Sequence, residues 1–320
     1  MIETEIKTAI QWRKNLNLNG DTETLRIFYG PGESTHSELQ HIAVDLFLDH
    51  AWITQWKVVS DRTIKEVCRA LQSDIMKLKA IVLMDRSSVA SEADVKTVHG
   101  TPAVDRFTVK EFGIPYLIQM SATKHPGLFL DHAPLRKWIL RTQKDKTLLN
   151  LFSYTGSLSV AAGVAGANQV TTLDLSKSTI DWAKDNWTNA GLDPAKGDFI
   201  YGDVFEWLPK MKKRNQTFDT ILCDPPSFSR SKTGGTFSTN KDSTRLHEQI
   251  FPLLKSGGVL VTSINSENHL EKNFLADIEA AAEKTKTKIL ILGRVDLPES
   301  FPTPANLKDR YLKGFYILKE

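Results

Sequence analysis

The chain contains few cysteines and no long apolar run, and both absences limit what it can be. Its only cysteines, Cys68 and Cys223, are too few for a disulfide framework or a cysteine-based metal site. No apolar stretch approaches the roughly 20 residues that a membrane-spanning helix needs, and the first residues lack the basic-then-apolar pattern of a secretory signal. We therefore expect a cytoplasmic protein with no metal and no membrane span.

An excess of charge is also lacking. The 320 residues carry 41 Lys and Arg against 38 Asp and Glu, a net charge of +3. This balance permits nucleic-acid binding without requiring it, because a local patch matters more than the total. The candidate basic spots, which are also typical of solvated surfaces, are Lys212–Arg214, Arg230 with Lys232, and Lys284, Lys286 and Lys288.

The order of apolar segments predicts an α/β protein in two parts. Beyond about Leu148, strands and helices alternate at a spacing typical of a parallel sheet covered on both faces. The predicted strands there span residues 147–152, 169–173, 199–201, 218–223, 259–262, 288–292 and 314–318. The predicted helices span residues 157–166, 178–190, 246–254 and 271–284, with a short one carrying Phe205 and Trp207. We expect domains at residues 1–120 and 121–320.

The first domain reads as a smaller α+β unit. Its predicted strands are residues 24–29, 52–57 and 80–84, and its predicted helix is residues 65–77, while residues 87–103 are expected to form loops or a hairpin. In the second domain, residues 229–243 are rich in Ser, Thr and Gly. We expect a mobile loop there, either a substrate lid or a plain surface loop.

The segment Asp224–Phe228, with the sequence Asp-Pro-Pro-Ser-Phe, directly follows a run typical of a buried parallel strand. Proline cannot donate a backbone hydrogen bond and restricts its predecessor, so the two prolines end the strand. Ligands bind at this carboxyl edge in open α/β sheets. The Asp224 carboxylate can hold an amino group there and Phe228 can stack on a base. The alternatives are an ordinary strand end and a core position for Phe228.

Three further features end neighbouring strands. Gly156 lies at the first strand-to-helix turn, where a ligand can approach the backbone and the free amides of the following helix. A nicotinamide enzyme would have G-x-G-x-x-G there, so the single glycine suits a carboxylate-bearing ligand such as S-adenosylmethionine better. Asp174 can hold ribose hydroxyls, and Asp203 can meet an adenine amino group.

Together these motifs resemble the bacterial 23S ribosomal RNA large-subunit methyltransferases I and K/L. The similar segments are residues 149–156, 173–177 and 224–228, with further matches at 25–30, 45–57, 125–132 and 311–314. The resemblance implies a class I methyltransferase fold, with a seven-stranded, mostly parallel sheet and a C-terminal β-hairpin. It also implies S-adenosylmethionine as cofactor and RNA, specifically ribosomal RNA, as substrate.

The resemblance also implies roles for individual residues. The catalytic candidates are Asp224, Pro225 and Phe228. The cofactor-binding candidates are Phe152, Ser153, Tyr154, Thr155, Gly156, Asp174, Leu175, Ser176, Asp203, Val204, Asp224, His132 and Arg136. His132 stands where the family has Gln, so it is either a cofactor contact or a structural residue. Arg136 is either a cofactor contact or a helix salt-bridge partner.

Two departures bear on the substrate. Only about 20 residues precede the central domain, so we expect no N-terminal PUA domain, and RNA would have to be recognised elsewhere. Methylation of cytosine C5 needs a cysteine nucleophile, which the family's C5 enzymes place just after the strand equivalent to 259–262. Residues 262–266 contain none, and Cys223 should point away from Asp224. We therefore expect a nitrogen target, with a protein or small-molecule methyltransferase, or a noncatalytic RNA-binding protein, as alternatives.

Overall fold

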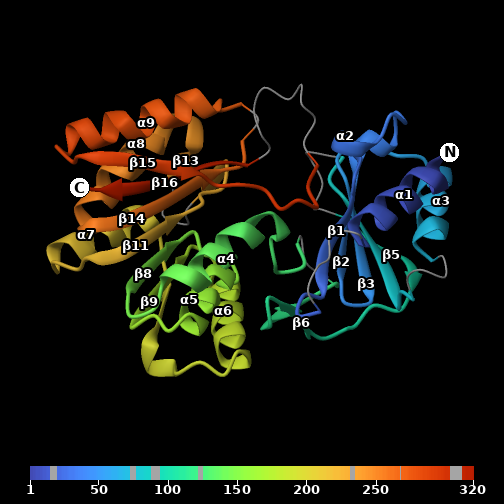
Figure 1. Cartoon of the computed structure of the whole chain (residues 1–320), viewed down its shortest axis with the longest axis horizontal. Coiled ribbons are helices and arrows are strands. Elements are labelled where there is room, and N and C mark those ends of the chain that lie inside the picture. The colour runs from blue at the N-terminus through green and yellow to red at the C-terminus, as the bar shows by residue number, and fades with distance from the viewer. Residues whose placement is uncertain are drawn as a thin grey trace. The chain divides into compact units, whose positions relative to one another are not determined.

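A computed structural model describes most of the chain as two compact units. The described residues are 1–14, 20–72, 77–87, 94–121, 125–230, 235–266, 268–302 and 312–320. The first unit comprises Met1–Asp131 with Pro298–Leu307, and the second comprises His132–Leu297 with Lys308–Glu320. The chain is coloured along its length in Figure 1. The predicted boundary lay at residue 120, whereas the first unit runs to Asp131 and also takes in a segment from late in the chain.

The first unit is built on a five-stranded sheet of order β1-β2-β3-β4-β5. Only the β3–β4 pair is parallel, and α3 connects these two strands. Apolar residues of α1 and α3 join those of the sheet in one core, and β6 and β7 form a separate hairpin. The bounds are α1 Ile2–Lys14, β1 Thr24–Tyr29, α2 Gly30–Glu33, β2 Ile42–Phe47, β3 His50–Gln55, α3 Asp61–Leu71, β4 Ala80–Asp85, β5 Asp94–Gly100, β6 Phe107–Glu111 and β7 Ile114–Ile118.

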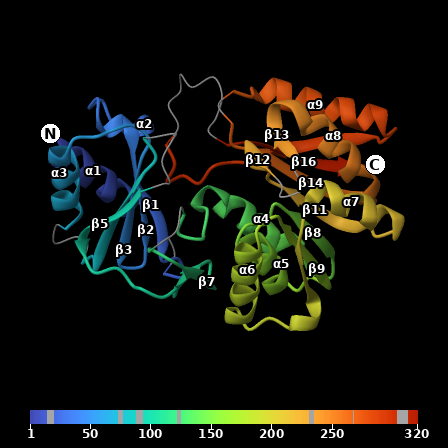
Figure 2. The same cartoon turned by 180° about the vertical axis from the view of Figure 1, so that it is seen from behind.

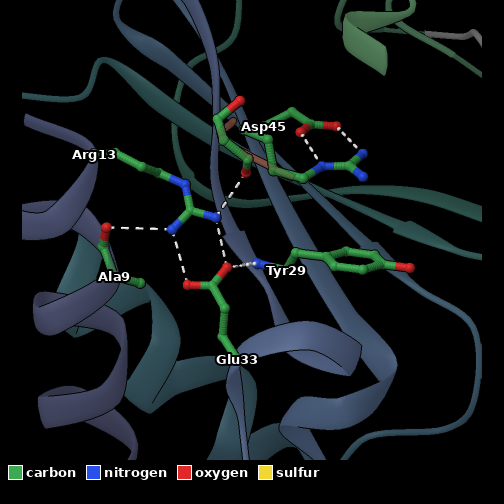
Figure 3. Close-up of polar contacts among 7 residues, drawn as sticks. Ala9, Arg13, Tyr29, Glu33 and Asp45 are labelled. Carbon is green, nitrogen blue, oxygen red and sulfur yellow. Dashed lines mark hydrogen bonds and ion pairs between the residues drawn. The ribbon is translucent and has the colours of Figure 1, made fainter. Parts of the chain in front are cut away.

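A buried arginine ties the late segment to the N-terminal helix of the first unit. The guanidinium of Arg13 donates to both carboxylate oxygens of Glu33, at 2.8 and 2.5 Å, and to the backbone oxygens of Ala9 and Ser300 (Figure 3). The backbone amide of Tyr29 completes the set by donating to Glu33. Because Arg13 is only 1% exposed, these bonds satisfy a charge that would otherwise be costly to bury.

The second unit is built on a seven-stranded sheet of order β10-β9-β8-β11-β14-β16-β15. The first five strands are parallel, and β16 pairs antiparallel with both β14 and β15, as the predicted C-terminal hairpin requires. The strand bounds are β8 Thr147–Leu151, β9 Gln169–Asp174, β10 Gly197–Tyr201, β11 Phe218–Cys223, β14 Leu254–Ile264, β15 Ile289–Arg294 and β16 Lys313–Lys319.

Helices cover both faces of this sheet (Figures 1 and 2). One group packs on one face and consists of α4 Ala133–Thr142, α5 Ser157–Val164 and α6 Lys177–Asn189. The other group consists of α7 Val204–Lys213, α8 Thr239–Ile250 and α9 Glu271–Lys284. The central strands β8 and β11 are buried at nearly every position, as expected for a sheet covered on both faces. Within the described residues, no helix is both long and apolar enough to span a membrane.

Several elements differ from the sequence-based expectations. The segment 229–243 holds the end of β12 Phe228–Arg230, all of β13 Thr236–Ser238 and the start of α8, so the expected loop is wrong for its described part. Phe237 and Ser243 are buried and attach this segment to the core. The Ser- and Thr-rich composition of the segment does not indicate these contacts. Residues 231–234, including Lys232, lie outside the described part.

Other helix and strand boundaries differ from the predicted ones because of local helix capping and strand pairing. Helix α3 begins at Asp61, ahead of the predicted 65, because the Ser60 hydroxyl caps the amide of Thr63. Part of the expected loop 87–103 is strand β5, which pairs with β4. Elements α1, β2, β6, β7 and α4 were not predicted.

Candidate active site at the carboxyl edge of the second sheet

The parallel strands of the second unit end at one edge, and most of the predicted site residues follow these ends. Strands β8, β9, β10 and β11 end at Leu151, Asp174, Tyr201 and Cys223. Every predicted site residue except His132 and Arg136 lies at one of these strand ends or in the segment that follows it. His132 is the N-cap of α4, and Arg136 lies in its first turn. The topology therefore gathers segments that are distant in sequence at the edge where α/β sheets bind ligands.

The turn Phe152–Gly156 is a tight, strained loop between β8 and α5. Phe152 and Tyr154 have positive φ angles of 55° and 50°, a conformation that costs free energy for residues other than glycine. Gly156, with φ of 73°, is the N-cap of α5, and a Cβ there would lie 2.8 Å from the Cβ of Ala183. Gly156 makes no side-chain cap hydrogen bond to this helix, and the N-terminus of a helix favours an anion.

Buried polar side chains of the neighbouring strands and helices support this turn. The Asn150 and Thr172 side chains both donate to the Ser159 hydroxyl at 2.9 Å, and Asn186 donates to the backbone oxygen of Thr155 at 2.9 Å. In contrast, the buried hydroxyl of Ser153 has no hydrogen-bond partner among the described residues. A buried polar atom without a partner is costly, so the Ser153 hydroxyl is suited to a ligand.

Asp174 links the first turn to the second. Its Oδ2 accepts from the amide of Tyr154 at 2.9 Å, and its Oδ1 accepts from the Ser176 amide and the Thr179 hydroxyl, each at 2.9 Å. Burial raises the pKa of the Asp174 carboxyl above its ordinary value, and these three hydrogen bonds oppose the increase. Leu175, also a predicted site residue, lies partly buried between Asp174 and Ser176.

The third turn contains Asp203 and Val204. Asp203 is the N-cap of α7, and its Oδ1 accepts from the amide of Phe205 at 2.8 Å. Val204 is buried. The Phe205 ring lies 5.7 Å from the Phe237 ring, which in turn lies 5.8 Å from Phe152. Three aromatic side chains from separate segments of the chain therefore form one cluster at this edge.

Asp224 is held by a residue of the neighbouring strand. The Ser263 hydroxyl, near the end of β14, donates to Asp224 Oδ1 at 2.6 Å, a length typical of a hydroxyl–carboxylate bond. His132 Nε2 lies 3.6 Å from Asp224 Oδ2. This nitrogen is buried and has no hydrogen-bond partner in the described part of the chain. Asp224 keeps a side-chain exposure of 33%, so the carboxylate is oriented and still accessible.

The rest of the Asp-Pro-Pro-Ser-Phe segment divides into anchored and exposed residues. Pro225 is buried, and the Ser227 hydroxyl donates to the backbone oxygen of Asn265 at 2.9 Å. Phe228 is 64% exposed. The alternative that Phe228 packs in the core is therefore wrong, and its exposed ring can stack on a ligand.

Arg136 lies beneath the first turn and has no exposed surface. Its Nη1 approaches the hydroxyl of Ser157, the first residue of α5, at 3.5 Å. This contact places the guanidinium at the N-terminus of α5.

Cys223 faces away from this edge. Its thiol is buried, and burial, followed by the charge of Asp224, raises its pKa far above the ordinary value. The neighbouring Thr262 hydroxyl bonds to Nε2 of buried His247 at 3.0 Å, and His247 Nδ1 bonds to the Ser243 oxygen at 2.7 Å. The Cys223 side chain is thus part of the core between β11, β14 and α8.

The donors and acceptors of the site fit S-adenosylmethionine. Amide and hydroxyl donors at residues 153–157 match a carboxylate, whereas the acidic Asp174 and Asp203 match hydroxyl and amino groups. The aromatic cluster offers apolar faces to a nucleobase. Among the described residues, no group of three or more His, Cys, Asp or Glu could hold a metal ion.

Sequence reasoning missed three residues of this edge: Ser263, Phe205 and Phe237. In the sequence, residues 262–266 are notable only for the absence of a cysteine. The pairing of β11 with β14 is what places the Ser263 hydroxyl beside Asp224. The sequence places Phe205 only on a helix. Its position two residues after Asp203, a predicted cofactor-binding residue, is the signal that could have assigned it to the site. Phe237 lies in the segment expected to be a loop.

Known proteins share this architecture. A sequence profile described as S-adenosylmethionine-dependent methyltransferase matches residues 26–310. YwbD of Bacillus subtilis, named provisionally as a ribosomal RNA large subunit methyltransferase, is 31% identical over 322 residues, which covers 99% of this chain and 80% of YwbD. Ribosomal RNA large subunit methyltransferase K/L of Shewanella pealeana is 30% identical over 280 residues, or 85% of this chain, but the match covers only 38% of that protein.

Solved structures agree. The crystal structure of SMU.776, named provisionally as a methyltransferase and complexed with SAH, matches with a TM-score of 0.88 and 28% identity, covering 99% of this chain and 82% of that one. A methyltransferase structure from Agrobacterium tumefaciens, with a TM-score of 0.70 and 20% identity, shares the fold. These similarities confirm the predicted fold class, enzyme class and cofactor. The chain belongs to the S-adenosylmethionine-dependent methyltransferase family.

Proposed function

We propose that the enzyme methylates a nitrogen atom of a ribosomal RNA base. The observation that carries this proposal is the segment Asp224–Phe228, which combines an oriented, accessible carboxylate with an exposed aromatic ring. An amino group and a base face are the chemical partners of such a pair. The RNA substrate is supported by the two curated relatives, both of which carry ribosomal RNA methyltransferase names. Such a substrate would place the enzyme in the cytoplasm with the ribosomes.

For the cofactor, we assign the amino-acid end to Ser153–Gly156 and the α5 N-terminus, with buried Arg136 below it. We assign the ribose to Asp174, flanked by Leu175 and Ser176. Asp174 Oδ2 accepts only one of the hydrogen bonds described above, and a carboxylate oxygen can accept about two, so a ribose hydroxyl can be added.

We assign the adenine to Asp203 and Val204, beside the rings of Phe152 and Phe205. Asp203 Oδ1 accepts from the amide of Phe205, and Oδ2 would accept from the adenine amino group. His132 would lie between the cofactor and Asp224, since its Nε2 is within 3.6 Å of that carboxylate. Its buried, unsatisfied nitrogen favours a ligand contact over a purely structural role.

The site residues would act mainly by positioning the base. S-adenosylmethionine, when bound, supplies an electrophilic methyl group on its sulfonium. Phe228 would stack on the base, and Asp224 would accept a hydrogen bond from its amino or ring N–H group, with the Pro225 carbonyl as a second acceptor. Ser263 would keep the carboxylate in one orientation. In-line transfer to a nitrogen needs little more than this alignment and the exclusion of water.

The position of the cysteines supports nitrogen over cytosine C5. Attack on cytosine C6 requires an accessible thiolate, and Cys223 is 1% exposed with a strongly raised pKa. Residues 262–266, the segment in which the C5 enzymes of the family carry their cysteine, contain none in this chain. Within this segment the Ser263 hydroxyl donates to Asp224 instead. The second cysteine, Cys68, belongs to helix α3 of the first unit.

Mass spectrometry of ribosomal RNA nucleosides from cells with and without the gene tests the proposal. We expect the loss of one methylated base other than 5-methylcytidine, restored by the wild-type gene and not by Asp224→Ala. Loss of 5-methylcytidine would contradict the nitrogen target. If no nucleoside changes and the purified enzyme methylates protein or a small molecule instead of ribosomal RNA fragments, the RNA substrate is wrong.

A further inference from the structure

The hairpin that follows the Asp-Pro-Pro segment has two chemically different faces. Strands β12 and β13 pair antiparallel, with Phe228 opposite Ser238, Ser229 opposite Phe237 and Arg230 opposite Thr236. Both strands carry their labels in Figure 2. Side chains alternate between the faces of a strand, so Phe228 and Arg230 share one face while Phe237 belongs to the other.

The inner face is anchored on the cofactor side of the site. Phe237 is only 4% exposed, and its ring packs against Phe152 and Phe205 at centroid distances of 5.8 and 5.7 Å. Packing between aromatic rings adds to the free energy gained from burying them. The backbone at the end of the hairpin is fixed as well, since the Thr239 amide donates to the Ser227 oxygen at 3.2 Å. The described strands of the hairpin are thus held firmly on the second unit.

The outer face presents an aromatic ring and a cation side by side. Phe228 is 64% exposed and Arg230 is also exposed. Residues two apart on a strand are separated by roughly 7 Å, and a long arginine side chain extends beyond that distance. A nucleotide whose base stacks on Phe228 would therefore have a phosphate within reach of the Arg230 guanidinium.

We propose that this outer face, Phe228 with Arg230, is a binding surface for single-stranded RNA at and beside the target base. The inference rests on the proposed function and adds to it the form of the RNA. An exposed ring can stack only on a base whose face is accessible, which a duplex does not offer. The positive charge of Arg230 complements the phosphate backbone. The substrate strand would thus leave Asp224 along β12.

Binding of two RNA probes tests this surface. The probes are a fluorescein-labelled 12-nucleotide oligouridylate and a 12-base-pair RNA duplex, measured by fluorescence anisotropy over a range of KCl concentrations. We expect the wild type to prefer the single strand. Phe228→Ala should weaken single-strand binding by about 5- to 150-fold, the range for loss of one stacked base, and Phe228→Trp should restore it.

Arg230→Gln should weaken single-strand binding at low salt and reduce the slope of log K against log salt by about 0.7, the value for one phosphate contact on a single strand. Two matched controls, Leu290→Ala on the exposed edge of β15 and Lys210→Gln on α7, should leave binding unchanged. Because Phe228 is exposed, its variants should keep the wild-type melting temperature and affinity for S-adenosylhomocysteine.

The surface proposal is wrong if Phe228→Ala or Arg230→Gln binds the single strand like the wild type. It is equally wrong if the wild type binds duplex as tightly as single strand or binds neither. Methyl transfer to ribosomal RNA fragments separates this inference from the proposed function. If the wild type methylates RNA and the variants bind normally, only the surface is refuted. If the wild type methylates no RNA, the proposed function itself fails.

Discussion

Ser263 donates a 2.6 Å hydrogen bond to Asp224 across two neighbouring parallel strands, β14 and β11. Both residues lie at the carboxyl ends of their strands, and Ser263 is only 2% exposed. The bond therefore holds the Asp224 carboxylate in one orientation while part of it stays accessible. This pair is the structural basis for the catalytic role that we propose for Asp224.

We expect Ser263→Ala to lower kcat/KM for RNA methylation by about 10- to 100-fold, because a hydrogen bond to a charged group contributes roughly 1.5–3 kcal/mol. Cofactor affinity, measured by calorimetry, should change little. The double variant with Asp224→Asn should be no less active than Asp224→Asn alone, since Ser263 acts through that carboxylate. Additive losses in this cycle would show that Ser263 works independently.

Gly156 should be intolerant of a side chain. Gly156→Ala would force a residue with a Cβ to adopt φ near 73° and bring that atom 2.8 Å from the Cβ of Ala183. The conformation alone costs roughly 1–2 kcal/mol. Relief of this strain would displace the turn, so we expect cofactor affinity measured by calorimetry to fall by about 5- to 30-fold. Gly293→Ala is the matched control, because nothing lies within 4 Å of the added atom there. Equal effects of both changes would contradict the proposed role of the turn.

Cys223→Ser should leave methyl transfer within about twofold of wild type. The thiol is buried on the core side of β11, and its raised pKa keeps it protonated. Activity is measured with ribosomal RNA fragments, and circular dichroism checks the fold. An inactive but folded Cys223→Ser enzyme would instead support the carbon-5 mechanism.

The stability of the second unit should fall in mild acid because of His247. Burial lowers the pKa of this imidazole to about 4 from its ordinary 6.5. Between these two values the unfolded chain binds a proton that the folded chain does not, so the free energy of unfolding decreases as the pH falls through that window. The full loss is on the order of 3 kcal/mol.

Urea unfolding at pH 7.5, 5.5 and 4.5 measures this effect, with His247→Gln as the comparison. The variant should be less stable than wild type at pH 7.5, because it loses part of the bonding to Ser243 and Thr262. It should also lose less stability on acidification. An identical pH dependence in both proteins would show that His247 does not titrate on unfolding.

Much of the second unit could be predicted because its local patterns agree with its fold. The apolar run 218–223 ends at two prolines, and strand β11 spans those residues. Helix α9 has the predicted bounds, 271–284, because its apolar periodicity is regular. The first unit was harder, since α3 begins at a cap formed by Ser60 and β5 is defined by its pairing with β4. Pairing partners are not visible in a strand's own residues.

The sequence by itself determined the family, the cofactor and the order of the site motifs, because Gly156, Asp174, Asp203 and Asp224 each follow a recognisable strand. Only the tertiary structure decided which side chains meet there. The approach of His132 to Asp224, the bond from Ser263 and the packing of Phe237 all join segments that are distant in the chain. Parallel pairing brings their ends together, and side-chain alternation then decides that Cys223 faces the core while Asp224 faces the site.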